Sequence, residues 1–222
     1  MRFLTISKFL LILFVPFIIF LSVAKLTAFD SSFYNQKFAE YNVKQSVPDA
    51  ISMHDKVIDF VTGKNNVLPN DFNEGEKLHL RDVRKTINNL TVSLYILILL
   101  LMLLFFASAC ELKTKKQIAN FLGKALFFGG VFTLIFAAAL FLFISSDFSS
   151  AFESFHNLFF EKGTYAFDPA KEMIVRLYPE QLFMDLGLKI SKNVLIVSIV
   201  VILLGLLLLL KSKSKKNKNR TK

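Results

Sequence analysis

Four long apolar runs constrain the fold of this chain more than any other feature of its sequence. They cover about residues 9–29, 90–109, 118–144 and 194–210 and contain very few charged side chains. An α-helix rises about 1.5 Å per residue, so about 20 residues cross a hydrocarbon layer about 30 Å thick. A soluble chain of 222 residues, 54% of them hydrophobic, cannot bury runs of this length. The sequence therefore predicts an all-α membrane protein with four transmembrane helices.

The first apolar run has two interpretations. Arg2 and Lys8, the apolar stretch after them and the small residues at 22–24 are typical of a cleavable signal peptide. The alternative is a retained helix. We favour the retained helix because the apolar residues continue to Phe29 and because an even number of spans fits the charge distribution.

The charged residues predict the orientation of the chain in the membrane. Twelve Lys or Arg residues but only one acid, Glu111, lie at the N-terminal end, in the turn at 110–117 and after Leu210. The long segments between them carry all other acids and are net negative. Because Lys and Arg mark cytoplasmic loops, we predict that both termini are cytoplasmic. The net charge of +10 follows from this asymmetry, so we expect no nucleic-acid binding. The basic tail sets the topology or contacts anionic lipid headgroups.

These assignments divide the chain into eight segments of a multi-pass membrane protein. The predicted transmembrane helices are residues 1–29, 87–109, 118–144 and 191–210. Two extracellular loops, which together form an aromatic-rich cap, are predicted at 30–86 and 145–190. The cytoplasmic segments are the turn at 110–117 and the basic tail at 211–222.

The first extracellular loop contains patterns for two helices before the second span. One is an amphipathic helix near the membrane interface, indicated by Phe33, Tyr34, Phe38 and Tyr41. The other begins at Pro48-Asp49 and ends at Gly63. Its apolar face is expected to hold Ile51, His54, Ile58 and Val61.

A third helix is expected to continue from this loop into the second span. Asn73 and Glu76 have the spacing of a capping box at its start. His79, Asp82 and Thr86 follow at spacings of three and four, so they share one stripe of the helix. His79 precedes the apolar run by about 11 residues, or about 16 Å of helix, which places it near the lipid headgroups.

The second extracellular loop contains a histidine among phenylalanines. Ser149 or Ser150 is expected to cap a short helix. One face of that helix is expected to hold Phe152, Phe155, His156 and Phe159. Further on, Asp168 is expected to cap another helix, with Pro169 at its first position.

The common catalytic and metal-binding motifs are absent from the sequence. There is no Gly-x-Ser-x-Gly elbow, HExxH, phosphate-binding glycine loop or dinucleotide fingerprint. The single cysteine, Cys110, excludes a disulfide framework and a multi-cysteine zinc site. The spans lack buried acids and histidines, which disfavours ion-coupled transport. His54, His79 and His156 have no ligand spacing, so we expect no metal and no cofactor.

Several short motifs occur in a characteristic order. They are Glu76-Lys-Leu-His79-Leu-Arg-Asp82-Val83 before the second span, Phe155-His156-x-x-Phe159-Phe160, Phe167-Asp168-Pro169 and Leu177-Tyr-Pro179-Glu180-x-x-Phe183. With four spans and an outward cap, this combination resembles the Lit family of bacterial lipoprotein intramolecular transacylases. The resemblance covers nearly the whole chain. Tyr165 stands where the resemblance implies a tryptophan, and the chain has no Trp.

The resemblance implies an acyltransferase that acts at the extracellular face of a bacterial plasma membrane. Its substrate would be a diacylated lipoprotein in the outer leaflet, with membrane lipid as the other partner. The sn-2 acyl chain of the diacylglyceryl group would move to the free α-amine of the N-terminal cysteine and leave a lyso-form lipoprotein. No external nucleophile is needed, which agrees with the missing serine elbow.

The resemblance also implies roles for individual residues. His79 and His156 are expected to be catalytic and to face each other. His156, among phenylalanines, is favoured as the base, while His79, nearer several charges, serves the oxyanion or donates to the alkoxide. The expected substrate-binding residues are Arg81, Asp82, Phe155, Phe159 and Tyr165. Asp82 either orients His79 or pairs with Lys85, and Arg81 either holds a polar substrate group or is solvated. His54 is expected to be structural or on the surface.

Two other functions fit the same sequence. A non-enzymatic membrane scaffold or binding protein would tolerate His to Asn at both His79 and His156. A lipid hydrolase with a His–Asp dyad and water would release free fatty acid. An intramolecular transacylase would not tolerate these substitutions and would release no free fatty acid.

Overall fold

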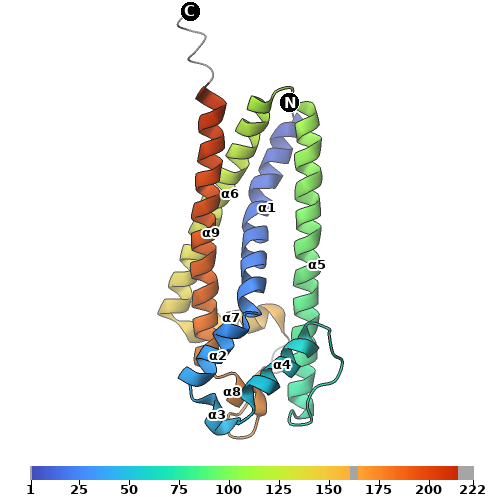
Figure 1. Cartoon of the computed structure of the whole chain (residues 1–222), viewed down its shortest axis with the longest axis vertical. Helices are drawn as coiled ribbons and strands as arrows, with labels where there is room; N and C mark the ends of the chain where they lie inside the picture. Colours follow the sequence, from blue (N-terminus) through green and yellow to red (C-terminus); the bar gives the residue numbers. More distant parts are fainter. Residues whose placement is uncertain (1, 161–164, 215–222) are drawn as a thin grey trace, which may run out of the picture. The chain divides into compact units, whose positions relative to one another are not determined.

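The described residues of the computed structural model, 2–160 and 165–214, are helical with short connections and contain no strand (Figure 1). Four helices are long, and the others are short helices between them. In chain order they are α1 (Arg2–Ala28), α2 (Ser31–Glu40), α3 (Val43–Ser46), α4 (Ala50–Val61), α5 (Glu74–Glu111), α6 (Lys115–Ser146), α7 (Phe148–Phe159), α8 (Met173–Leu177) and α9 (Glu180–Ser214).

The four long helices, α1, α5, α6 and α9, correspond to the four apolar runs. Each is long and apolar enough to cross a membrane. The predicted all-α membrane fold with four candidate spans is therefore confirmed. The helix expected to continue into the second span is also confirmed, because α5 runs for 38 residues without a break.

The chain divides into two compact units, and each long helix contributes residues to both. The first unit, the bundle unit, comprises the described residues of Met1–Ala24, Ser93–Phe141 and Ser191–Lys222. Small residues let its helices approach closely. A Cβ atom at Gly205 would lie 2.6 Å from the backbone nitrogen of Phe127. Ser7 and Ser108 share a buried hydrogen bond of 2.6 Å. Close backbone contact and hydroxyl pairs are the usual means of packing helices in lipid.

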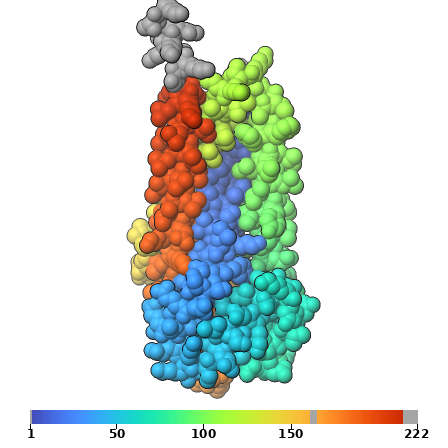
Figure 2. Space-filling view, in the orientation of Figure 1, coloured from blue at the N-terminus to red at the C-terminus, as the bar shows by residue number. Residues whose placement is uncertain are grey.

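The second unit, the cap unit, comprises Lys25–Val92 and Leu142–Ile190. It has its own apolar core, which includes Phe38, Phe72, Leu177 and Leu182, each almost fully buried. Both predicted cap loops supply this core, so the aromatic-rich cap expected from the sequence is present. Figure 2 shows α2, α3 and α4 forming a continuous surface on the face in view.

Glu76 belongs to a capping box in the first loop of the cap unit and also bonds to the second loop. The backbone N–H of Glu76 donates to Asn73 Oδ1 at 2.9 Å, and the backbone N–H of Asn73 donates to Glu76 Oε2 at 2.6 Å. The predicted capping box is therefore confirmed. The other carboxylate oxygen, Oε1, accepts a hydrogen bond from the backbone N–H of Ile174 at 2.6 Å. Glu76 thus accepts hydrogen bonds from two backbone N–H groups that have no partner within their own helices, one before α5 and one at the start of α8.

Two predicted helix starts in the second loop are wrong. α7 is capped by Asp147, whose Oδ1 accepts from the backbone N–H of Ser150 at 3.0 Å, and neither Ser149 nor Ser150 is the cap. Asp168 does not cap a helix. Its Oδ1 accepts from the backbone N–H of Ala170 within a turn, and α8 begins only at Met173. An aspartate side chain accepts backbone hydrogen bonds equally well in a turn and at a helix start, so the residue type alone does not distinguish a turn from a helix cap.

The apolar face predicted for α4 also needs correction. The buried side chains of this helix are Ala50, Met53, His54, Val57, Phe60 and Val61. Ile51 and Ile58 are only partly buried at the edge of the core. The face is therefore rotated relative to the prediction, because residues at 53, 57 and 60 also follow helical spacing.

Candidate active site

His79 lies in the second turn of α5, held there by the capping box that starts the helix. Its side chain is 7% exposed. Its Nδ1 atom is buried and has no hydrogen-bond partner among the residues that the structure describes. A buried ring nitrogen without a partner costs free energy unless something else bonds to it. His79 therefore presents an unused polar atom in apolar surroundings.

His156 lies near the end of α7 and has a fixed hydrogen bond. Its Nδ1 lies 2.8 Å from the carbonyl oxygen of Phe152, one turn earlier, and the side chain is 8% exposed. A carbonyl oxygen only accepts, so Nδ1 must carry the proton in this contact. The neutral ring therefore has its lone pair on Nε2, which is the atom that can act as a base.

The two imidazole rings lie together although 77 residues separate them in the chain. Their centroids are 6.3 Å apart and their planes differ by 20°. Phe160 contacts both rings, at 5.0 Å from His79 and 5.6 Å from His156. Phe167 packs edge-on against His79 at 5.5 Å, and Phe152 lies 4.0 Å from His156. Aromatic rings of the second cap loop thus enclose the histidine pair.

Burial favours the neutral form of both histidines. It lowers the pKa of His79 from 6.5 to about 4, and the neighbouring His156 adds to this effect while Asp82 opposes it. Burial also lowers the pKa of His156, against the smaller effect of its hydrogen bond to Phe152. Desolvation is thus the largest cause of the pKa shift of His79, although Asp82 lies only one turn away.

Three predicted substrate-binding residues are aromatic and lie in the same region of the cap unit. Tyr165 packs against His156 with ring centroids 4.7 Å apart, and its hydroxyl donates to Asn157 Oδ1 at 2.9 Å. Phe155 packs on His156 at 5.4 Å but is 52% exposed. Phe159 contacts Phe155 at 5.0 Å. Tyr165 and Phe155 therefore contact the pair, and Phe159 extends the aromatic surface beyond it.

The two charged residues predicted for substrate binding are placed differently. Asp82 is partly buried one turn after His79. It makes no hydrogen bond to His79 Nδ1, and within the described ranges it forms no ion pair with Lys85. Arg81 lies two residues after His79, and residues at this spacing do not share a helix face. It lines a separate cavity with Arg84 and Lys85.

Three phenylalanines that enclose the pair were not among the predicted site residues. Phe152 and Phe160 stand four residues before and after His156, a spacing that places side chains on one side of a helix. Phe167 approaches from a later segment, so no local spacing reveals it. All three occur in the predicted aromatic stripe or in the motifs of the family resemblance.

His54, the third histidine, belongs to the core of the cap unit. It is 3% exposed, its Nδ1 lies 2.9 Å from the Tyr178 hydroxyl, and its ring lies 4.1 Å from Tyr34. Burial lowers its pKa to about 4. Its ring contacts are to core aromatics, which agrees with a structural histidine.

Chemically, the site offers acid–base groups that are buried among aromatic side chains. Within the described ranges, no group of three or more His, Cys, Asp or Glu side chains is arranged to hold a metal ion. Two neutral imidazoles surrounded by phenylalanines can accept, donate and transfer protons at a reacting carbonyl group.

Comparisons with known proteins identify the family. The family model described as lipoprotein intramolecular transacylase Lit matches residues 9–183. A solved structure of the membrane-integral lipoprotein intramolecular transacylase Lit from Bacillus cereus is similar, with a TM-score of 0.82 and 22% identity over 96% of this chain and 99% of that chain. Two structures of the same protein with a histidine replaced by arginine or alanine both have TM-scores of 0.77. The arginine variant is 21% identical over 97% of this chain and 96% of that chain. The alanine variant is 22% identical over 96% of both chains.

These likenesses establish a shared fold, and the family model establishes membership. No curated protein sequence matches the chain significantly. The chain belongs to the Lit family of lipoprotein intramolecular transacylases and is an acyltransferase.

Proposed function

We propose that this protein transfers the sn-2 acyl chain of a diacylglyceryl lipoprotein to the free α-amine of the same lipoprotein's N-terminal cysteine. The observation that carries this proposal is the buried pair of His79 and His156, whose rings lie 6.3 Å apart. One ring has an assigned basic nitrogen, and the other has a buried nitrogen without a partner. These are the groups needed to move protons at an ester carbonyl.

The reaction needs no nucleophile from the protein. Closure of the amine onto the ester carbonyl carbon gives an eight-membered ring of substrate atoms: N, Cα, Cβ, S, two glyceryl carbons, the ester oxygen and the carbonyl carbon. A C–N bond forms and the ester C–O bond breaks. The ammonium group loses two protons in all. One leaves to solvent and the other ends on the glyceryl oxygen as a hydroxyl group.

His156 serves as the base in this scheme. Its Nδ1–H is held by the Phe152 carbonyl, so Nε2 receives the proton of the attacking amine and returns it to the leaving alkoxide. His79, in the tautomer with a proton on Nδ1, donates to the oxyanion of the tetrahedral intermediate. A free α-amine has a pKa of about 8, so a neutral imidazole is a suitable base near neutral pH.

The aromatic side chains around the pair support transfer over hydrolysis. Phe160, Phe167 and Tyr165 contact the two histidines, which are only 7% and 8% exposed to solvent. Phe155 and Leu158 on α7 are exposed apolar side chains and suit the acyl chains of the substrate. We place this site at the extracellular face, with both termini cytoplasmic, as the distribution of Lys and Arg predicts.

A reconstituted assay tests the proposal directly. The purified protein in liposomes is mixed with a synthetic diacylglyceryl-cysteine peptide, and the products are analysed by tandem mass spectrometry. We expect an N-acylated lyso-form peptide with the same mass as the substrate. Release of free fatty acid would instead support a hydrolase, and an unchanged peptide would support a non-enzymatic scaffold. Either result contradicts the proposal.

A further inference from the structure

One of the sequence motifs, Leu177-Tyr-Pro179-Glu180-x-x-Phe183, takes no part in the acyl-transfer scheme. In the structure it forms the end of α8 and the first turn of α9. Leu177 and Leu182 are fully buried in the core of the cap unit, so the chain is fixed on both sides of the short connection between these helices. Phe183, the next residue, is only partly buried, and its ring contacts α7.

Helix α7, which carries His156, buries little surface of its own. His156 is the buried residue among its 12, and its exposed side chains include Phe155 and Leu158. Helices in proteins are stabilised mainly by packing of an apolar face. A helix that buries a single side chain gains little from such packing, so its orientation depends on the few tertiary contacts that it makes.

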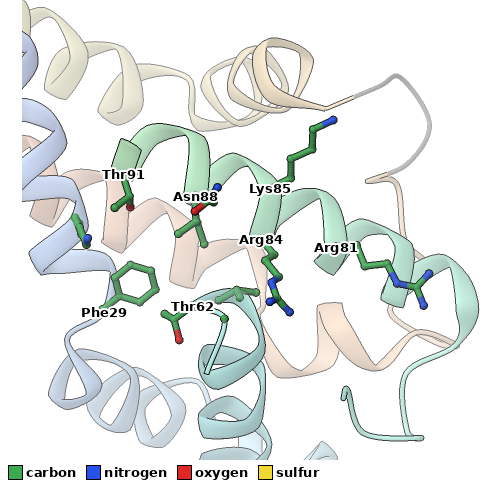
Figure 3. A pocket seen from close by; sticks show the side chains of 11 residues that line it. Phe29, Thr62, Arg81, Arg84, Lys85, Asn88 and Thr91 are labelled. Carbon is green, nitrogen blue, oxygen red and sulfur yellow. The ribbon is translucent and has the colours of Figure 1, made fainter. Parts of the chain in front are cut away.

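Helix α5, which carries His79, is held by contacts of its own. Figure 3 shows Arg84 extending from α5 toward Thr62 at the end of α4. The Arg84 guanidinium donates to the backbone oxygen of Asn65 at 3.3 Å and to Asn66 Oδ1 at 3.0 Å, in the turn after α4. α5 is therefore fixed independently of α7, and the placement of one imidazole ring against the other depends on what holds α7.

Phe183 supplies one of the contacts that hold α7. Its ring centroid lies 5.8 Å from that of Phe152, with the planes at 51°. The Phe152 ring lies 4.0 Å from the His156 ring, and the Phe152 carbonyl oxygen accepts the His156 Nδ1–H at 2.8 Å. Phe183 also contacts the buried Tyr178 ring at 6.2 Å, so it links α7 to the core of the cap unit.

We propose that Phe183 is a positioning residue for His156. By packing on Phe152, it holds α7 so that the Phe152 carbonyl keeps the proton on Nδ1 and leaves the lone pair of Nε2 for the amine proton. This inference rests on the proposed function, in which His156 is the base. Without the Phe183 ring, α7 moves more freely and the bond to the carbonyl opens more often. The released imidazole then also adopts the tautomer with its proton on Nε2, which cannot accept a second proton at that atom.

The test compares Phe183→Ala with Phe183→Tyr in the purified full-length protein. Phe183→Ala should lower kcat per folded molecule by about two- to twelvefold, the rate equivalent of the roughly 0.5–1.5 kcal/mol that an aromatic pair contributes. Phe183→Tyr keeps the ring and should retain the wild-type rate. Nitrogen-15 NMR of protein labelled at histidine reports the tautomer, and His156→Asn identifies the signals of that residue. We expect the Nδ1–H tautomer in the wild type and a mixture of both tautomers in Phe183→Ala.

The matched control is Phe143→Ala, which removes the same ring at a similar exposure, 41% against 37% for Phe183. Within the described ranges Phe143 has no ring contact with α7, so this variant should change neither the rate nor the tautomer. If Phe183→Ala does not fold, Phe183→Leu, which keeps apolar volume without the ring, gives the same comparison.

The possible outcomes separate positioning from a general loss of stability. An unchanged tautomer in Phe183→Ala would overturn the positioning role even if the rate falls, and an unchanged rate would overturn it even if the tautomer changes. An equal effect in Phe143→Ala would do the same. The NMR measurement needs no turnover. Absence of acyl transfer in the wild type would therefore contradict the proposed function, while the tautomer would still decide whether Phe183 positions His156.

Discussion

At the residue scale, the two histidines of the pair differ in what holds their rings. His156 donates Nδ1–H to the Phe152 carbonyl, whereas His79 Nδ1 has no described partner. We expect His79→Asn and His156→Asn each to lower acyl transfer by about 10² to 10⁴, the usual contribution of acid–base groups. Rates on the synthetic diacylglyceryl peptide check this, with membrane insertion measured in parallel. A loss below about tenfold at both positions would remove the pair from the mechanism.

His54 provides the matched histidine control. His54→Asn removes a core ring that contacts Tyr34 and the Tyr178 hydroxyl. We expect it to lower the free energy of unfolding by about 1–3 kcal/mol, the cost of leaving a buried polar partner unpaired. The acyl-transfer rate per folded molecule should stay within a few-fold of wild type. A rate loss as large as that of His156→Asn would assign His54 to the reaction.

The pH dependence of stability has a defined sign. Burial lowers the pKa of His54 to about 4, whereas an unfolded histidine has a pKa of about 6.5. Between pH 6.5 and pH 4 the unfolded chain therefore binds a proton that the folded chain excludes, so stability falls as the pH falls through this window. Thermal unfolding in detergent should show this fall, and His54→Asn should make it less steep. His79 adds to the same window because its pKa is also lowered to about 4.

At the scale of elements, Glu76 links the start of α5 to the start of α8. Glu76→Gln leaves only one accepting oxygen for the backbone N–H groups of Asn73 and Ile174. We expect a loss of about 1–3 kcal/mol of stability and faster amide hydrogen exchange in residues 173–177. Glu74→Gln, two residues earlier at an exposed position, is the matched control and should change neither. Unchanged exchange in α8 after Glu76→Gln would show that the link contributes little.

At the scale of the whole molecule, the topology that we propose makes a testable assignment for each loop. The native Cys110 is exposed at the end of α5 and should react with an impermeant thiol reagent only after the membrane is opened. A cysteine at Asn65, in a variant with Cys110→Ser, should react in intact cells. Lys162, another suitable position in the second loop, lies outside the described residues. Protection of the Asn65 cysteine until lysis would invert the topology and place the histidine pair on the cytoplasmic side.

The parts of the structure that the sequence determined by itself are those set by near neighbours along the chain. The apolar runs predicted four long helices because the length of an uninterrupted apolar stretch decides by itself whether a helix can span the bilayer. The Asn73–Glu76 capping box was predictable because both partners lie within one turn. The histidines could be selected as candidates only because the motifs around them resemble those of the Lit family.

Tertiary structure decided what depends on residues far apart in the chain. The second hydrogen bond of Glu76 reaches Ile174, and the enclosure of His79 combines Phe160 and Phe167 from the other cap loop. The side of α5 that Arg81 faces likewise follows from packing. Local spacing places side chains on a face of a helix, but it does not state which distant segment packs on that face. This is the physical reason why the sequence predicted the helices and the tertiary structure determined the surroundings of the histidine pair.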